Sequence, residues 1–333
     1  MSGPDAEPFD EFDWIEQDLM PLAEGAPEAL GLRDDAAVIP GRPGFDLVIS
    51  KDAIVAGVHF LPDDPPELVA RKLLRVNLSD LAAKGAEPYG YFLAVAWPSG
   101  TSRETRRRFA EGLKLDQDEF GVRLMGGDTV STPGPLTASA TVLGWVPAGR
   151  MIPRGGARAG DAVLVSGTIG DSGLGLRAAQ GGLAELSAAD RDWLADRYRM
   201  PRPRLGLDAA LREYAHAAAD VSDGLIADAG RIAAASGLAI EIDLARLTLS
   251  DAASRWLDSQ PDRIAALRDL ATAGDDYEIV CTLPPDNAAN FKAAAEAVGL
   301  TFTQIGVAAA GAGIVVLHDG AEVIMDRLGY RHS

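Results

Sequence analysis

The chain has 333 residues, of which 47% are hydrophobic, and it carries 31 basic against 49 acidic side chains. This composition is typical of a globular protein with about two domains, and it excludes a disordered chain. The net charge of −18 argues against nucleic acid or an anionic membrane surface as a partner, because like charges repel. The same charge would repel a phosphorylated substrate unless divalent cations stood between them.

The N-terminus and the cysteine content point to one cellular compartment. Residues 1–18 are acidic and polar, unlike a secretory signal, and no apolar run approaches the roughly 20 residues of a membrane-spanning helix. Cys281 is the single cysteine, so an internal disulfide cannot form. We therefore expect a cytoplasmic protein with no membrane partner.

Apolar periodicity and turn residues predict mixed α and β structure in both halves of the chain, after a loose or short helical lead-in of about 20 residues. Helices are predicted at residues 66–84, 102–120, 191–199, 205–218, 224–236, 262–271 and 286–298. Strands are predicted at residues 47–50, 89–97, 122–125, 136–146, 162–166, 238–242 and 278–283, with short β segments over 302–325. A segment rich in Gly, Arg and Pro at 150–160 indicates a boundary between domains 1–148 and 149–333.

The helix predicted at residues 66–84 carries two polar side chains on one face, because Asn77 and Asp80 are three residues apart. Gly85 is placed to end this helix, with Pro88 just beyond it. Two interpretations are open for Asp80. It forms an ordinary surface ion pair with Lys84, or its carboxylate is directed into a metal site.

Six aspartates share one feature, which is that each follows a β-type run or lies at a turn or helix end. They are Asp35, Asp52, Asp80, Asp128, Asp220 and Asp223. Short carboxylates with Ser or Thr beside them are hard oxygen ligands that suit Mg²⁺, whereas four histidines and one cysteine are few for a zinc site. Each aspartate alone has a structural explanation such as helix capping, but six together favour divalent cations.

Four further features are candidates for binding. The turn Gly126-Gly127-Asp128-Thr129 allows close approach of a phosphate, and Arg154 is either a phosphate clamp or an exposed linker residue. The loop at residues 167–175 follows a strand and opens a helix, but it matches neither the Walker A nor the dinucleotide pattern, which favours a structural role. His59 stands alone among apolar residues, where a histidine is more often structural than catalytic.

Several segments, taken in order, resemble the thiamine-monophosphate kinase family, of the superfamily named for aminoimidazole ribonucleotide synthetase. The most specific are Asn77-Leu78-Ser79-Asp80 and Gly57-Val58-His59-Phe60. The others lie at residues 33–36, 50–52, 126–129, 220–225, 274–278 and 329–330. The resemblance runs from about residue 12 to Tyr330.

This resemblance implies an α+β (mixed α/β) two-domain architecture, with N-terminal sheets joined across a homodimer. It implies transfer of the γ-phosphoryl group of ATP to thiamine monophosphate with several Mg²⁺ ions, the last step of thiamine diphosphate biosynthesis. The implied metal ligands are Asp35, Ser50, Asp52, Asp80, Asp128, Asp220 and Asp223. The implied ATP contacts are Gly127, Asp128, Arg154 and Ser222, with Arg154 and Asp80 closest to the chemistry. The implied substrate contacts are His59, Asp275 and Tyr330.

The chain departs from the family pattern at three positions. Arg33 replaces a usual Gly, Lys51 a frequent Thr, and Asp275 a usual Glu. A charged lysine cannot bind Mg²⁺, so Lys51 would contribute a backbone carbonyl or contact a phosphate instead. The alternatives are another ATP-dependent enzyme of the superfamily, or a non-catalytic protein that binds a nucleotide or a divalent cation.

Overall fold

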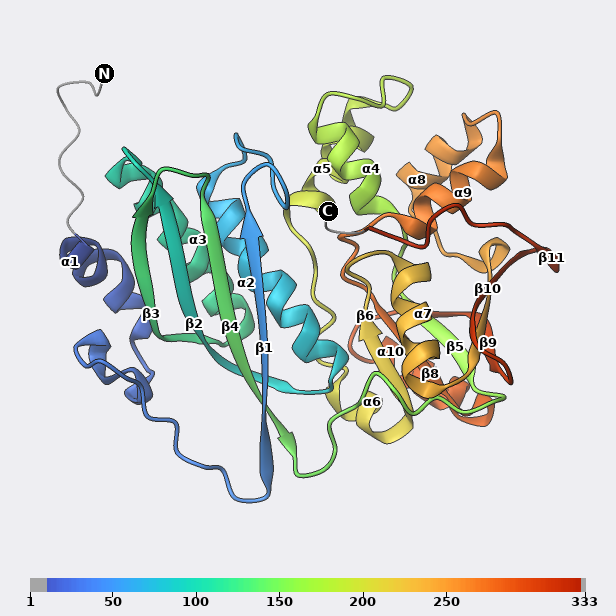
Figure 1. The fold of residues 1–333 in the computed structure, drawn as a ribbon, viewed down its shortest axis with the longest axis horizontal. Helices are drawn as coiled ribbons and strands as arrows, with labels where there is room; N and C mark the ends of the chain where they lie inside the picture. Colours follow the sequence, from blue (N-terminus) through green and yellow to red (C-terminus); the bar gives the residue numbers. More distant parts are fainter. Residues whose placement is uncertain (1–10, 331–333) are drawn as a thin grey trace. The chain divides into compact units, whose positions relative to one another are not determined.

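The structure is a computed structural model, and it describes residues 11–330. Expectations for residues 1–10 lie outside the described residues. The chain divides into two compact units, each with its own sheet (Figure 1). The first unit comprises the described residues up to Leu81 together with Glu87–Gly149, and the second comprises Ala82–Ala86 and the described residues from Arg150 onward.

The first unit contains a four-stranded sheet with the strand order β1-β4-β2-β3. Its strands are β1 Phe45–Val55, β2 Glu87–Pro98, β3 Arg123–Thr132 and β4 Thr137–Pro147. Strand β4 is antiparallel to both β1 and β2, and β2 is parallel to β3. Before β1 lie α1 Glu11–Trp14, the π-helical η1 Ile15–Leu19, and the 3₁₀ helices η2 Met20–Ala23 and η3 Pro27–Leu32. Strands β1 and β3 are therefore the two opposite edges of this sheet.

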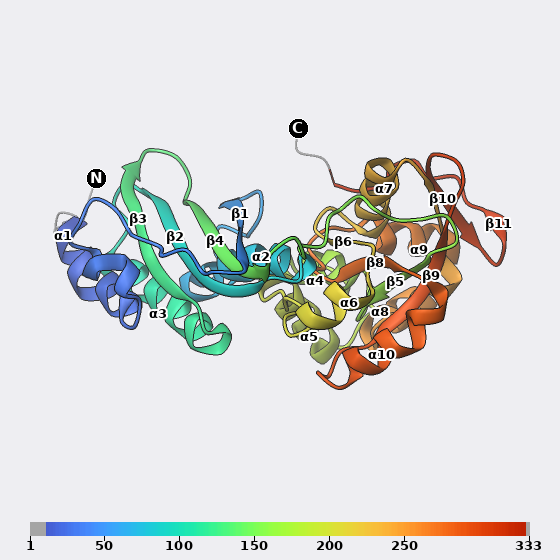
Figure 2. The same cartoon turned by 90° about the horizontal axis from the view of Figure 1, so that it is seen from below.

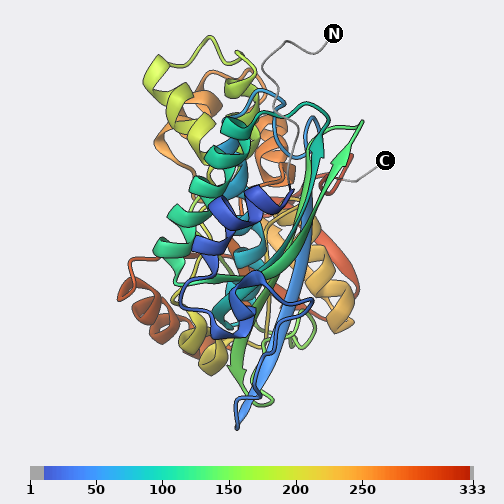
Figure 3. The same ribbon diagram turned by 90° about the vertical axis from the view of Figure 1, so that its left-hand side faces the viewer.

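Helices α2 Pro66–Ala83 and α3 Arg103–Phe120 cover one face of this sheet, as the blue-green helices in Figure 3 show. In β1 the side chains alternate, so that Val48 and Ile54 are buried while Ile49 is 58% exposed on the other face. Asp116 of α3 fixes the two helices to each other, because its carboxylate accepts hydrogen bonds from the guanidinium groups of Arg71 and Arg75. Helix α2 is thereby held as a rigid support beside β1.

The second unit contains a seven-stranded sheet with the order β11-β10-β7-β9-β5-β8-β6. Its strands are β5 Ala162–Ser166, β6 Ala217–Asp220, β7 Ala239–Asp243, β8 Ile279–Leu283, β9 Phe302–Ala309, β10 Gly313–His318 and β11 Ala321–Glu322. Its helices are α4 Asp171–Ala179, α5 Ala188–Arg199, α6 Asp208–Tyr214, α7 Leu225–Ser236, α8 Asp251–Asp258, α9 Arg263–Thr272 and α10 Ala288–Glu296, with 3₁₀ turns η4 Leu244–Arg246 and η5 Pro285–Asn287. The β7–β10 pair is parallel and the other pairs are antiparallel.

Both faces of the second sheet are covered by helices (Figure 2). Val163 and Val165 of β5 join a core with residues of α4, α5, α7, α8 and α9, whereas Ala162 and Leu164 join a second core with residues of α6 and α10. A strand buried on both faces needs apolar side chains at every position, which explains the continuous apolar runs of the central strands.

The predicted mixed α/β architecture is confirmed, with differences in the second unit. The helix predicted over 205–218 is wrong at its end, because α6 stops at Tyr214 and residues 217–220 form the buried strand β6. Helix α8 was not predicted. Residues 82–86, assigned from sequence to the first domain, group with the second unit, where the Nζ of Lys84 donates to the carbonyl oxygen of Ala218. Among residues 11–330, no helix combines the length and hydrophobicity needed to cross a membrane.

The contact between α2 and α3 generates a prediction about stability. A Cβ atom added to Gly112 would lie 2.2 Å from the carbonyl oxygen of Glu67, so Gly112→Ala must push the two helices apart. We expect a loss of about 1–3 kcal/mol in the free energy of unfolding, measured by urea denaturation. Gly41→Ala is the control, because nothing lies within 4 Å of its added Cβ. Equal stability of both variants would contradict the close packing described here.

Candidate functional site

The predicted site residues fall in both units, and each set is described within its own unit. In the first unit, β1 and α2 bring two of them together. Ser50 lies on the helix-facing side of β1, and its Oγ donates to Oδ2 of Asp80 on α2 at 2.5 Å. Asp52, two residues further along β1, lies on the same side of the strand. Two oxygen atoms that could bind a cation, Oγ of Ser50 on β1 and Oδ2 of Asp80 on α2, thus lie in contact.

Asn77 of α2 holds the edge strand β1 against the helix. Its Oδ1 accepts a hydrogen bond from the backbone N–H of Asp52 at 2.8 Å, and its Nδ2 donates to the carbonyl of Leu73 at 2.8 Å. Asn77 is fully buried, and it pairs an N–H group that an edge strand would otherwise leave without a strand partner. The amide is therefore a positioning group that sets the spacing between Asp52 and α2. Lys51 is exposed and, by alternation, points to the opposite side of β1 from Ser50 and Asp52.

His59 lies in a compact turn after β1. The backbone N–H of Val55 donates to its Nδ1 at 3.1 Å, so Nδ1 acts as an acceptor and the neutral ring carries its proton on Nε2. The Nζ of Lys72, a side chain only 2% exposed, donates to the carbonyl oxygen of His59 at 2.8 Å. The first contact orients the imidazole, and the second holds the backbone of the turn.

The remaining predicted residues of this unit lie apart from Ser50 and Asp80. Asp128 is exposed on β3, and β4 and β2 separate β3 from β1, which places their backbones about 14 Å apart at the usual strand spacing. Gly127 has a structural reason to be glycine, because a Cβ there would lie 1.9 Å from the carbonyl oxygen of Leu93. Asp35 is exposed in the irregular segment between η3 and β1. Within one chain, an ion bound at Asp80 is therefore out of reach of Asp128.

In the second unit, backbone hydrogen bonds bring three distant segments together around the turn at residues 220–223. The N–H of Asp275 donates to the carbonyl of Ser222 at 2.8 Å, and the N–H of Tyr330 donates to that of Asp223 at 2.8 Å. Cβ atoms on Gly274 and Gly329 would approach these same two carbonyl oxygens to 2.7 and 2.4 Å. The structure therefore gathers five predicted site residues, and the glycines permit the close approach. They are Asp220, Ser222, Asp223, Asp275 and Tyr330.

Asp228, which sequence reasoning missed, supports this turn from α7. Its buried carboxylate accepts hydrogen bonds from the backbone N–H groups of Ser222 and Asp223, both at 3.0 Å. Burial raises the pKa of Asp228 to about 6, and the guanidinium of Arg231, which pairs with both Asp228 and Asp223, opposes that increase. An acidic residue in the first turn of a predicted helix is a signal that could have identified it.

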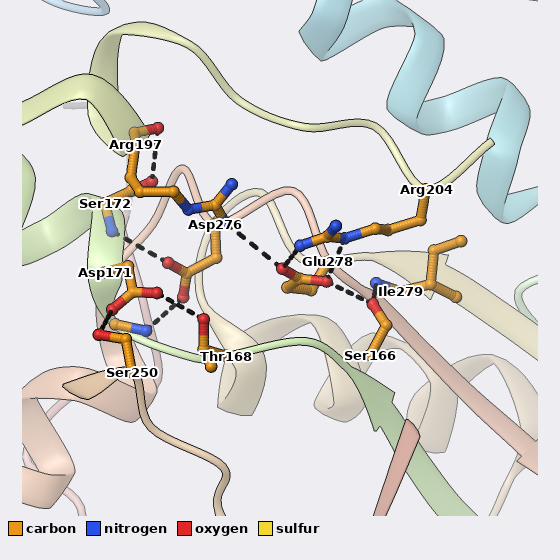
Figure 4. A network of polar contacts seen from close by, with 11 residues as sticks. Ser166, Thr168, Asp171, Ser172, Arg197, Arg204, Ser250, Asp276, Glu278 and Ile279 are labelled. Carbon is orange, nitrogen blue, oxygen red and sulfur yellow. Dashed lines mark hydrogen bonds and ion pairs between the residues drawn. The ribbon is translucent and has the colours of Figure 1, made fainter. Parts of the chain in front are cut away.

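The segment at residues 167–175, a loop followed by the start of α4, has the structural role that its sequence favoured. Its backbone N–H groups at Gly170 and Ser172 donate to the carboxylate of Asp276, at 2.6 and 3.1 Å (Figure 4). This fully buried carboxylate occupies the position that a phosphate takes at a helix N-terminus. Burial holds the pKa of Asp276 well above its usual range, and nearby Asp171 adds to the increase. Arg154 is exposed in the segment before β5.

Oxygen side chains in each unit could contribute to a cation site that water and substrate phosphates complete. Among residues 11–330, no group of three or more His, Cys, Asp or Glu side chains is arranged around one possible metal position. Mg²⁺ is usually bound through one or two carboxylates together with water and substrate phosphates, rather than by a complete protein cage. The Ser50–Asp80 pair and the aspartates of the 220–223 turn fit that mode.

Comparison with known proteins places the chain in a family. The model of the AIR synthase related protein, N-terminal domain, matches residues 33–146, and that of the AIR synthase related protein, C-terminal domain, matches residues 158–319. The thiamine-monophosphate kinase of Caulobacter vibrioides is 53% identical over 332 residues, covering 100% of this chain and 93% of the relative. That of Escherichia coli K12 is 41% identical over 304 residues, covering 91% of each chain.

Solved structures agree with these sequence matches. The thiamine-monophosphate kinase of Stenotrophomonas maltophilia K279a has a TM-score of 0.82 at 37% identity, covering 95% of this chain and 98% of that one. The structure of AaThiL complexed with AMPPCP and TMP has a TM-score of 0.78 at 30% identity, covering 88% and 89%. A hydrogenase maturation protein, HypE, at 18% identity and a TM-score of 0.72, shares the fold. The chain is therefore an enzyme that belongs to the thiamine-monophosphate kinase family, within the AIR synthase related proteins.

Proposed function

We propose that the chain transfers the γ-phosphoryl group of ATP to thiamine monophosphate, with Mg²⁺, and releases thiamine diphosphate and ADP. The observation that carries the proposal is the convergence of Asp220, Ser222, Asp223, Asp275 and Tyr330 in a chain of this family. The structure of a relative complexed with AMPPCP and TMP supports the choice of substrates.

The proposed roles follow from the donor chemistry of each side chain. Oxygen ligands for Mg²⁺ would come from Asp35, Ser50, Asp52, Asp80, Asp128, Asp220 and Asp223. ATP would be contacted by Gly127, Asp128, Arg154 and Ser222, and thiamine monophosphate by His59, Asp275 and Tyr330. Arg154 suits a phosphate because a guanidinium forms paired charge-assisted hydrogen bonds. His59 would present an Nε2–H donor, since its Nδ1 is already an acceptor for Val55.

The acceptor needs little chemical activation. A phosphate monoester has a second pKa of about 6, so its oxygen is largely anionic near neutral pH and needs no general base. The obstacle is repulsion between two anions on a chain of net charge −18. Bound Mg²⁺ would supply the neutralising charge. The chain's own residues then hold the two phosphates in line, as phosphoryl transfer requires.

Incubation of the pure chain with Mg²⁺, ATP and thiamine monophosphate, followed by chromatography, tests the proposal. We expect thiamine diphosphate and ADP in equal amounts, and no product when unphosphorylated thiamine replaces the acceptor. Tight ATP binding without product would instead favour a non-catalytic nucleotide-binding protein.

We also infer that the enzyme acts as a homodimer in which the partner supplies Asp128. Asp52 and Asp128 lie on opposite edge strands, so one chain cannot bring them to one ion. The sheet face away from the helices exposes Ile49 and Val130, which are 58% and 48% exposed, and this supports a second copy covering that face. Joining edge β1 of one protomer to edge β3 of its partner would bring the strand that carries Asp52 beside the strand that carries the partner's Asp128.

Replacement of the carboxylate on α2 gives a first prediction for this function. Asp80→Asn keeps the size of the side chain but removes the charge that would bind Mg²⁺, so we expect kcat/KM to fall at least about 100-fold. Circular dichroism should show an unchanged fold. Asp118→Asn, an exposed carboxylate on α3, is the matched control and should retain full activity. A near-normal rate for Asp80→Asn would refute its role as a ligand.

Subunit complementation gives a second prediction. Asp52→Asn and Asp128→Asn chains should each be inactive alone, but co-expressed chains form hybrid dimers in which one of two sites has both aspartates. Random pairing makes half the dimers hybrid, so we expect about a quarter of wild-type activity. The activity of purified doubly tagged hybrids measures this directly. No recovery in the hybrids would contradict a shared site.

A further inference from the structure

The segment between α9 and β8 that carries Asp275 has an unusual backbone. We call residues 274–277 the strap. Asp275 and Tyr277 have φ values of +70° and +50°, a left-handed region that non-glycine residues rarely adopt. Such conformations persist only where the surroundings enforce them, and they cluster at functional sites. The strap must therefore be held by strong contacts on its inner side.

The first of these contacts is made by Asp276, which points into the second unit. Its carboxylate is fully buried and accepts hydrogen bonds from the backbone N–H groups of Gly170 and Ser172 at the start of α4 (Figure 4). A helix N-terminus is a favourable place for a carboxylate, because its N–H groups lack partners within the helix. This contact fixes the middle of the strap.

The second contact is made by Glu278, directly after the strap. Its carboxylate is fully buried and accepts a two-pronged interaction from Arg204, whose Nε lies 2.6 Å from Oε2 and whose Nη2 contacts Oε1 (Figure 4). Ser166 Oγ donates to Oε2 at 2.5 Å, and Arg197 lies at 3.4 Å from Oε1. Paired Arg–carboxylate bonds of this kind are strong and directional. Glu278 therefore anchors the end of the strap.

The outer side of the strap faces the 220–223 turn. The backbone N–H groups of Asp275 and Tyr277 donate to the carbonyl oxygens of Ser222 and Val221, both at 2.8 Å. The N–H of Val221 in turn donates to the carbonyl of Glu278 at 2.8 Å. The hydroxyl of Tyr277 lies 3.3 Å from Oδ1 of Asp275. Asp275 and Tyr277 thus contact the 220–223 turn, while Asp276 and Glu278 bind the interior of the unit and hold the strap in place.

We propose that Glu278 and Arg204 are positioning residues for the acceptor, because their pair holds the strap in the conformation that presents Asp275. The assignment rests on the proposed function, in which Asp275 contacts thiamine monophosphate. Neither residue touches the reacting atoms. Their loss should weaken acceptor binding more than it slows the chemical step or weakens ATP binding.

The test compares Glu278→Gln and Arg204→Met by steady-state kinetics. We expect KM for thiamine monophosphate to rise about tenfold, the equivalent of one lost charge-assisted hydrogen bond, with kcat and KM for ATP changed less than about threefold. Arg204→Lys keeps the charge but loses the paired geometry, so its KM should be intermediate. The side chain of Arg204 is 17% exposed, whereas that of Glu278 is fully buried. Replacing Arg204 therefore disturbs the core less, and the two Arg204 variants test the proposal even if Glu278→Gln fails to fold.

Two controls separate positioning from general destabilisation. Arg255→Met breaks a similar paired interaction with Asp190 on the surface of the same unit, away from the strap. Phe291→Leu lowers stability from the core in which α6 and α10 cover one face of the sheet. Both should leave KM for thiamine monophosphate unchanged at temperatures where circular dichroism shows folded protein.

The outcomes distinguish a failure of the proposed function from a failure of the positioning role of Glu278 and Arg204. A wild-type chain that forms no thiamine diphosphate would overturn the proposed function and this assignment with it. An active wild type whose Arg204 and Glu278 variants keep a normal acceptor KM would overturn this assignment alone. So would an equal rise of KM in the Phe291→Leu control.

Discussion

A buried carboxylate is unfavourable unless fixed donors replace the water that it loses, and this constraint separates two sets among the acidic residues of the chain. The inward set points into a core, and each member accepts hydrogen bonds from an arginine or from backbone N–H groups. Its members are Asp116, Asp228, Asp276 and Glu278. The outward set is exposed or half-buried on strands, loops and a helix, where cations can reach it. Its members include Asp35, Asp52, Asp80 and Asp128.

The two sets are coupled, because inward carboxylates fix the segments that carry functional residues. Asp228 holds the N–H groups of Ser222 and Asp223, and Asp276 and Glu278 hold the strap that carries Asp275. On α2 an amide has the corresponding role: Asn77 accepts a hydrogen bond from the backbone N–H of Asp52 and so holds Asp52 close to the helix that carries Asp80. A divalent cation arriving at such a site would find its oxygen ligands already placed, so little reorganisation is needed.

Parts of this arrangement follow from sequence, and the reasons are local. Helix α3 was predictable because Ser102 caps it and its apolar residues repeat at helical spacing. Strand β6 was not, because Ala217–Ala219 have a high intrinsic preference for helix, which burial between β8 and two helical layers overrides. The outward aspartates were identifiable by their position at element ends. The inward set was not, since the Arg204 partner of Glu278 lies 74 residues away and no local pattern links them.

Cation binding tests the difference between inward and outward carboxylates without a measurement of enzyme activity. Mn²⁺, used as a probe for Mg²⁺, can be titrated into the chain with ATP present while electron paramagnetic resonance reports the free ion. Asp80→Asn and Asp276→Asn each remove one carboxylate, the first from the outward set and the second from the inward set. We predict weaker or fewer bound Mn²⁺ ions for Asp80→Asn, and a smaller effect for Asp276→Asn, which acts only through the position of the strap. Unchanged binding in Asp80→Asn, or an equal loss in both, would contradict the account.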